Sequence, residues 1–270
     1  MSTSKSSKGF ISKSSVHRLL RDVKQIMVNP LSSNGIFYHH DEEDMLKGYA
    51  MIIGPEDTPY HNGYYFFELN FPNNYPYSPP IVYFCTNGDG IRFNPNLYKT
   101  GKVCISILNT WRGEQWNSCQ TISTLLLTIC TLLCKDPLLN EPGVDKNHND
   151  FSKYNRIVEY KSVEIGILHL INKHPTYWKS WFDIFYVEMI KHFVLNYSKT
   201  ENHVSAFIEN SRGKMKKIKT NLYSMEIEVN YIRLLEYMEE TYTNVKKIIE
   251  NDKTTYGEVY EILSLKKADT

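Results

Sequence analysis

Apolar residues near the start of the chain recur at the spacing of one helical face. Between residues 16 and 27 they fall three and four positions apart, which predicts an amphipathic helix. Ser15 precedes the run as a candidate N-cap, and Pro30 follows it as a stop signal. The opposite face carries Arg18 and Arg21, which are either solvated charges or part of a docking surface for a partner. The apolar positions are Val16, Leu19, Leu20, Val23, Ile26 and Met27.

Four runs rich in β-branched and aromatic residues follow, and turn residues separate them. In the third run, Tyr65, Phe67 and Leu69 occupy one phase. Glu68 and Asn70 occupy the other phase, which is the period-2 pattern of a strand with one buried face. The short connections predict a four-stranded antiparallel meander. The runs cover residues 36–40, 45–53, 64–71 and 81–85.

Two segments without a regular period interrupt this pattern. Prolines at four positions remove backbone donors from residues 71–80, so we expect a stiff, exposed loop there. Residues 86–117 contain turn residues but no sustained helical or strand period. A connection of that length usually carries function, so we look for chemistry in it.

Helical patterns dominate the remaining chain. Residues 121–134 are apolar nearly all round, which predicts a buried helix. Further helical patterns cover residues 151–172, 175–197 and about 222–250. In the last of these, apolar residues alternate four and three positions apart, which favours a packing stripe over a cofactor site.

Composition excludes several classes of protein. The chain has 270 residues, of which 41% are hydrophobic and 23% are charged, typical of one or two folded domains. Neither a run of 18 apolar residues nor a signal-peptide pattern is present, so we expect no membrane association and no secretion. Thirty-one Lys and Arg residues against 30 Asp and Glu residues give a net charge of +1, which disfavours a nucleic-acid partner.

Five widely spread cysteines do not suggest a disulfide scaffold, and they favour a reducing compartment, the cytoplasm or the nucleus. Cys130 and Cys134 lack a second Cys or His pair at zinc-site spacing, so we predict core residues and no metal site. Cys104 has no adjacent Asp or His to activate it, and sequence cannot place His61 or His148 beside it. A papain-like protease is therefore disfavoured.

An ordered set of short motifs surrounds Cys104. Each motif alone is weak, but the set, with the helix, the meander and the proline-rich loop, resembles the ubiquitin-conjugating enzyme family over about residues 15–165. The resemblance implies an α+β ubiquitin-conjugating fold with an N-terminal helix, a four-stranded antiparallel meander and a buried central helix. The motifs are Gly54-Pro55, Thr58-Pro59-Tyr60, Gly63, Phe71-Pro72, Tyr75-Pro76, Pro79-Pro80, Asn94-Pro95-Asn96, Gly101, Cys104, Ile107-Leu108, Trp116 and Leu132-Leu133-Cys134.

Departures from the common family pattern narrow the resemblance. Asn94 stands where the family usually has the His of His-Pro-Asn, and Ser106 replaces a common acid. Trp116 follows Cys104 by twelve residues instead of the usual eight, and Trp111 lies in the added segment. With the additional C-terminal helices, this pattern resembles the larger Z-type subfamily.

These patterns divide the chain into three parts. We expect a disordered Ser/Lys-rich tail over residues 1–14, because few apolar residues are available there to offset the entropy of ordering. A ubiquitin-conjugating core over residues 15–172 follows. Residues 173–270 form a helical extension, which we expect to pack on the core because its aromatic residues would otherwise leave an exposed apolar patch.

The resemblance implies a chemistry and three catalytic residues. Cys104 would accept ubiquitin or a ubiquitin-like modifier as a thioester from an activating enzyme and pass it to a substrate lysine, with or without a ligase. Asn96 would stabilise the oxyanion, tie down the loop, or do both; Glu141 is either the family's acidic gate residue or ordinary surface. No cofactor is expected, because the activating enzyme uses the ATP. The alternative is a non-catalytic scaffold, against which the presence of all three residues argues.

The resemblance also implies partner surfaces. Arg18 and Arg21 match basic positions that meet the activating enzyme, and Tyr77 stands where the family has an aromatic or apolar anchor for ligases. Trp116 is counted with this partner surface. Asn117-Ser118-Cys119 replaces the usual Ser-Pro-Ala, which puts binding to the common ligases in doubt.

Overall fold

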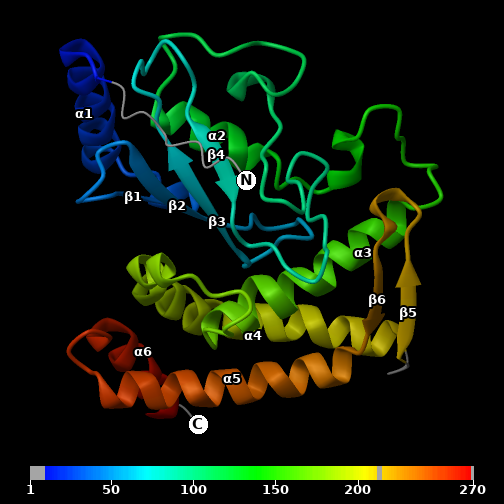
Figure 1. Ribbon diagram of the computed structural model, residues 1–270. Coiled ribbons are helices and arrows are strands. Elements are labelled where there is room, and N and C mark those ends of the chain that lie inside the picture. The colour runs from blue at the N-terminus through cyan, green and yellow to red at the C-terminus, as the bar shows by residue number, and fades with distance from the viewer. Residues whose placement is uncertain (1–9, 212–214, 269–270) are drawn as a thin grey trace, which may run out of the picture.

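A four-stranded antiparallel sheet organises the first part of the chain. The computed structural model describes residues 10–211 and 215–268. The strands lie in the sheet in the order β1, β2, β3, β4 (Figure 1), so the predicted meander is confirmed. The strands are β1 (Ile36–His40), β2 (Lys47–Ile53), β3 (Tyr64–Asn70) and β4 (Ile81–Phe84).

Strand β3 is buried on both faces, which the period-2 pattern did not predict. Phe67 lies opposite Ala50 of β2 and Phe84 of β4, and this face belongs to the core of the domain. On the other face Tyr64 and Phe66 are also fully buried. The prediction of one buried face is wrong because the C-terminal extension covers the second face.

Helix α1 (Lys13–Val28) begins two residues before the predicted N-cap. The Ser12 hydroxyl accepts the Ser15 N–H at 3.1 Å, so Ser12 caps the helix. Lys13 and Ser14, which the prediction placed in the tail, thus belong to the helix. Residues 1–9 lie outside the described structure. Leu20 and Met27 are 52% and 71% exposed, because the core covers a narrower arc than the apolar residues span. The buried stripe is Ser15, Leu19, Asp22, Val23 and Ile26.

The proline-rich loop is not the exposed segment we expected. Phe71 and Tyr75 are buried, and the Tyr75 hydroxyl donates to the Asp22 carboxylate of α1 at 2.6 Å. The Tyr75 ring also lies 6.0 Å from the Trp116 ring. Aromatic side chains thus fasten the loop to the domain and leave Tyr77 exposed at its tip.

The central helix is shorter and less enclosed than predicted. Helix α2 (Ile122–Thr131) starts at a capping box between Thr121 and Thr124. Its buried face includes Leu125 and Ile129, but Leu127 is partly exposed. Cys130 and Cys134 are half-buried, so they lie at the edge of the core.

The C-terminal half contains a hairpin that the helical patterns did not predict. Helix α3 (Phe151–Lys161) continues into a π-helical turn over Ser162–His169, close to the predicted 151–172. A 3-10 turn over Ser180–Phe185 then leads into α4 (Tyr186–Ser211). Strands β5 (Lys216–Lys219) and β6 (Glu226–Val229) precede α5 (Tyr231–Asn251) and α6 (Gly257–Ala268).

Buried and exposed residues alternate along the two strands of this hairpin. Each strand has only four residues, so the alternation is too short to be recognised next to a long helical pattern. Ile218 is buried between exposed lysines, and Ile227 is buried between exposed glutamates. Val229 is buried as well. The strands pair Ile218 with Ile227, so one face is apolar and the other is charged. The expectation of helix from residue 222 is therefore wrong; the helix starts at Tyr231, after the Asn230 cap.

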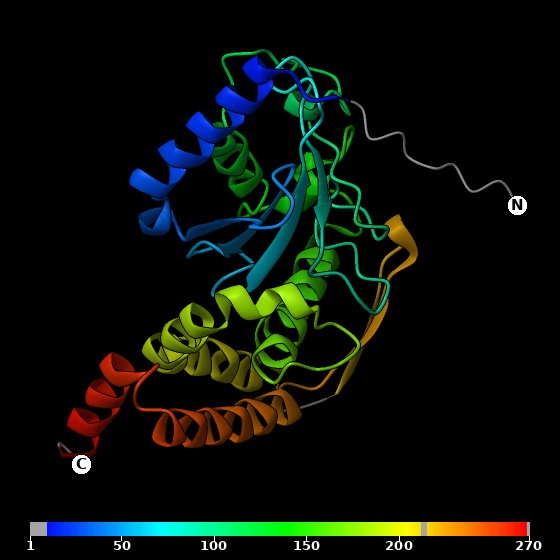
Figure 2. The same cartoon turned by 60° about the vertical axis from the view of Figure 1, so that its left-hand side comes forward.

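The extension packs against the open face of the sheet (Figure 1, Figure 2). The Phe182 ring stacks on the Phe66 ring of β3, with 3.8 Å between ring centroids. The Tyr64 hydroxyl donates to the Met189 carbonyl oxygen of α4 at 2.9 Å. In the described part of the chain, no helix is both long and apolar enough to cross a membrane.

Candidate active site

Cys104 lies between β4 and α2 on a loop that hydrogen bonds close from both sides. Its N–H donates to the Asn96 carbonyl oxygen at 2.9 Å. The Thr110 hydroxyl accepts the Ile105 N–H at 3.0 Å and donates to the Val103 carbonyl oxygen at 3.2 Å. The residue is 3% exposed. The backbone on either side of the thiol is therefore fixed, and Thr110 contributes to this although no sequence motif marks it.

Three of the other cysteines are poorer candidates for a nucleophile. Burial raises the pKa of the Cys85, Cys130 and Cys134 thiols. Because a thiol reacts as the thiolate, a raised pKa lowers its reactive fraction. Cys119 is exposed, which makes it the useful comparison for Cys104.

The Asn96 side chain forms a hydrogen bond to the backbone of Cys104. Its amide donates to the Cys104 carbonyl oxygen at 2.6 Å, and the residue is buried. This bond belongs to the loop-holding role that the sequence left open. A primary amide has two N–H donors, so one hydrogen bond to the loop leaves a second donor for a reacting oxygen.

Asn94 holds the loop to the central helix. It is fully buried, and its amide donates to the Leu132 carbonyl oxygen at 2.7 Å and to the Tyr60 hydroxyl at 3.1 Å. Its side-chain oxygen accepts the Asn96 N–H at 2.9 Å. Asn94 therefore holds the Asn-Pro-Asn turn in place through both the NH2 group and the oxygen of its side chain.

Arg92 joins this turn to the extension. Its guanidinium donates to the carbonyl oxygens of Asn94 at 3.2 Å and Pro95 at 2.5 Å. The same group lies over the rings of Tyr98 and Tyr223, at 3.7 and 4.8 Å from their centroids. Arginine is suited to this because it donates in its plane and stacks through its face. Its position two residues before the motif was visible in the sequence, but its role was not.

Glu141 is not free surface. It follows the 3-10 turn over Pro137–Asn140 and is half-buried. The Tyr223 hydroxyl, from the connection between β5 and β6, donates to Glu141 Oε2 at 2.5 Å. In the described part of the chain, Glu141 makes no hydrogen bond to Cys104 or Asn96. In the structure, Asn96 is thus hydrogen-bonded to Cys104, whereas Glu141 is hydrogen-bonded to Tyr223 of the extension.

The added segment after Cys104 forms one wall of an open cleft. The Gln115 amide donates to the carbonyl oxygens of Trp111 and Gly113, each at 3.1 Å, so the segment folds back on itself. The cleft has a volume of about 730 Å³ and reaches Pro142, the neighbour of Glu141. Its lining residues are Asn109, Thr110, Trp111, Arg112, Gln115 and Pro142.

The match to known sequences decides the family. The sequence model described as ubiquitin-conjugating enzyme matches residues 18–164, which is more than half of the chain. This chain belongs to the ubiquitin-conjugating enzyme family. The predicted α+β ubiquitin-conjugating fold is thereby confirmed, and the helices and hairpin after α3 are additions to it.

Relatives confirm the resemblance to the Z-type subfamily. The chain is 38% identical over 159 residues to ubiquitin-conjugating enzyme E2 Z of Xenopus tropicalis, covering 58% of this chain and 50% of that protein. It is 38% identical over 157 residues to the Homo sapiens protein of the same name, covering 57% and 44%. The chain thus spans about half the length of these relatives. The solved structure of human ubiquitin-conjugating enzyme E2 G1 is 32% identical, covers 46% of this chain and 98% of that chain, and has a TM-score of 0.40.

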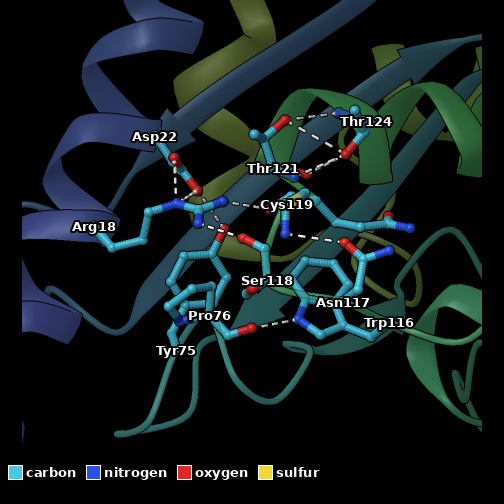
Figure 3. Close-up of polar contacts among 11 residues, drawn as sticks. Arg18, Asp22, Tyr75, Pro76, Trp116, Asn117, Ser118, Cys119, Thr121 and Thr124 are labelled. Carbon is cyan, nitrogen blue, oxygen red and sulfur yellow. Dashed lines mark hydrogen bonds and ion pairs between the residues drawn. The ribbon is translucent and has the colours of Figure 1, made fainter.

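Arg18 of this ubiquitin-conjugating family member is not the free charge that we expected (Figure 3). Its guanidinium donates to both Asp22 carboxylate oxygens at 2.9 Å. It also donates to the carbonyl oxygens of Ser118 at 2.5 Å and Gln120 at 2.6 Å. Its side chain is only 13% exposed. Arg18 ties α1 to the turn before α2, and its place on a partner surface stays a prediction; Arg21 is exposed.

Trp116 also has a structural role, and its place on a partner surface stays a prediction. It is buried, and its indole N–H donates to the Pro76 carbonyl oxygen at 2.7 Å. Figure 3 shows the ring beside Tyr75 and the proline-rich loop. Trp116 therefore holds the proline-rich loop against the core. Tyr77, on the same loop, is 74% exposed and remains the predicted contact for a ligase.

Proposed function

We propose that this protein accepts ubiquitin or a ubiquitin-like modifier as a thioester on Cys104 and transfers it to a substrate lysine. The proposal rests on the hydrogen bonds that connect the Asn-Pro-Asn turn to Cys104. Asn96 meets the cysteine through both its backbone carbonyl and its side-chain amide. An activating enzyme, which uses the ATP, supplies the modifier; a ligase and the protein substrate are the later partners.

Loading is an exchange between two thioesters. The Cys104 thiolate attacks the carbonyl carbon of the thioester on the activating enzyme. A carbon–sulfur bond to Cys104 forms, the bond to the donor cysteine breaks, and the donor leaves as a thiolate. Attacking and leaving sulfurs are of the same kind, so the step needs no strongly activated nucleophile.

Discharge is the harder step, because the acceptor is an amine. With a pKa near 10.4, only on the order of one lysine side chain in a thousand is neutral at pH 7. The neutral amine attacks the carbonyl carbon and produces a tetrahedral oxyanion. A preorganised amide donor stabilises such an oxyanion, and the second N–H of Asn96 is suited to this. Glu141 is suited to position the amine or to accept its proton.

A loading assay tests the proposed function. The protein would be incubated with ubiquitin-activating enzyme, ATP and ubiquitin, and the products compared with and without thiol reductant. We expect an adduct of one protein with one ubiquitin that the reductant releases. No adduct, with this supply or with a chemically prepared thioester of ubiquitin, would contradict the proposal and favour the scaffold alternative.

A further inference from the structure

The connection between β5 and β6 brings a phenol from the extension to the acid beside the active-site loop. The Tyr223 hydroxyl donates to Glu141 Oε2. These two residues are 82 positions apart in the chain, so the contact exists only because the extension folds back along α3. Figure 2 shows the hairpin running along α3 toward the loops of the core.

The hairpin tip is anchored independently of this bond. The Asp150 carboxylate accepts the N–H groups of Asn221 and Leu222, each at 2.9 Å. The Lys99 ammonium donates to the Tyr223 carbonyl oxygen at 2.7 Å. The tip is thus fixed from the start of α3 and from the Cys104 loop, and Tyr223 reaches Glu141 from a defined position.

The ring of Tyr223 has two further neighbours. The Arg92 guanidinium lies 4.8 Å from its centroid, and the Tyr154 ring packs edge-on at 5.9 Å. Arg92 also bonds the Asn-Pro-Asn turn. Ring and hydroxyl therefore have separate roles: the ring packs on Arg92, and the hydroxyl reaches the carboxylate.

The phenol can only donate at the pH of the reaction. Burial, and then the Glu141 carboxylate, raise the pKa of Tyr223 well above its ordinary value. Since the unperturbed value is near 10, the hydroxyl keeps its proton through the neutral and mildly alkaline range. The bond therefore takes up a lone pair of Oε2 and leaves Oε1 for another partner.

We propose that Tyr223 is a positioning residue for discharge, holding the Glu141 carboxylate so that Oε1 can take the proton of the attacking amine. This inference rests on the proposed function. In the step, the amine nitrogen forms a bond to the carbonyl carbon, and the bond from that carbon to Cys104 sulfur breaks. Cys104 leaves as a thiolate, and one amine proton passes to Glu141. The extension thereby takes part in the chemistry of the core.

The test is Tyr223→Phe, which keeps the ring and removes the hydroxyl. The 270-residue chain would be loaded from a small-thiol thioester of ubiquitin, and single-turnover discharge to free lysine would be followed. We expect loading to be unchanged and discharge to slow about tenfold, the lower end of what one hydrogen bond to a charged group contributes. The matched control is Tyr98→Phe, which removes a hydroxyl from the other ring on Arg92 and should discharge at the wild-type rate.

A double variant separates positioning from a general structural effect. If Tyr223 acts through Glu141, then Tyr223→Phe has no further effect on discharge in a Glu141→Ala background. Equal slowing in both backgrounds would overturn the proposal, because the hydroxyl would then act by another route. Unchanged discharge in Tyr223→Phe, or in Glu141→Ala alone, would overturn it as well.

Two measurements keep the outcomes distinct. A melting temperature for each variant identifies a folding defect, and the unchanged loading rate of Tyr223→Phe shows that the loop holding Cys104 is intact. Loading that slows together with discharge in Tyr223→Phe would count against a role confined to discharge. Failure of the wild-type protein to form any reductant-sensitive adduct would instead be failure of the proposed function, seen before any variant is compared.

Discussion

The loop that holds Cys104 and the hairpin that reaches Glu141 are built in opposite ways. Next to Cys104, the hydrogen bonds join residues five to eight positions apart, as from Asn96 to Cys104 and from Ile105 to Thr110. A longer-range bond from Asn94 to Leu132 anchors the turn to the central helix. In the hairpin, the bonds cross 71 positions from Asn221 to Asp150 and 124 positions from Lys99 to Tyr223. The bond from Tyr223 to Glu141 crosses 82 positions. The bonds next to Cys104 are thus specified locally, whereas the hairpin depends on the whole fold.

The short-range bonds of the Cys104 loop and the long-range bonds of the hairpin contribute to the active site in different ways. The short-range bonds next to Cys104 persist as long as the core and the sequence of the loop are intact. A long-range contact is lost whenever the extension moves or is removed, so it makes the step that it supports depend on the extension. We therefore expect damage to the extension to affect stability and discharge, and damage to the loop to affect the nucleophile itself.

Removing the extension should have the largest effect. Truncation after Asn172 uncovers Tyr64 and Phe66 on the sheet, which are fully buried. Each aromatic side chain buries about 150–250 Å², and at about 25 cal/mol per Å² the lost burial amounts to several kcal/mol of stability. We expect aggregation or a greatly lowered melting temperature, measured by light scattering and thermal denaturation.

Removing only α6 sharpens this test. That helix packs against α5 and lies at the end of the chain, so its loss should leave the sheet covered. A soluble Asn172 truncation with an unchanged melting temperature would contradict the account, whatever the α6 truncation does.

Replacing the two arginines of α1 should have different effects: we expect Arg18 to matter for stability and Arg21 for association with the activating enzyme. Arg18→Ala leaves the buried Asp22 carboxylate without its cation, and breaking a buried pair in this way costs about 3–5 kcal/mol. Urea denaturation would show the loss. Arg21→Glu should leave stability unchanged and slow loading by the activating enzyme at low salt, because exposed rim charges act on association. Equal destabilisation by both changes would show that the distinction is wrong.

Asn96→Ala should affect discharge far more than loading. The oxyanion of aminolysis would lose a donor, which reduces the rate about 10²-fold in the protease precedent. Single-turnover discharge of preloaded protein, compared with the rate of loading, measures the two effects separately. If loading falls as severely as discharge, then the bond to the Cys104 carbonyl oxygen is the whole function of Asn96.

Glu141→Ala should slow discharge about tenfold or more at pH 7, because the amine loses a proton acceptor. The deficit should shrink as the pH rises toward 9, since a larger fraction of lysine is then already neutral. Discharge rates at several pH values would show this. A deficit that does not change between pH 7 and 9 would leave Glu141 with positioning alone.

The sequence predicted what is local and misjudged what is distant. The four strands, α1 and the Asn-Pro-Asn turn with Cys104 could be identified because each carries its own pattern. Arg18 was misjudged as a surface charge because its acceptors, Ser118 and Gln120, lie about a hundred positions away. Tyr223 could not be found at all, because no spacing in the chain relates the β5–β6 connection to Glu141.

The most direct test of the account is the mass and stability of the adduct in two cysteine variants. Intact-protein mass spectrometry would follow loading of Cys104→Ser and, as the control, Cys119→Ser, which changes an exposed thiol. We predict that Cys119→Ser forms an adduct that thiol reductant releases. Cys104→Ser should form none, or an oxyester that survives reductant, because a hydroxyl without an adjacent base is a far weaker nucleophile. A reductant-sensitive adduct on Cys104→Ser, or its loss in Cys119→Ser alone, would contradict the assignment of Cys104.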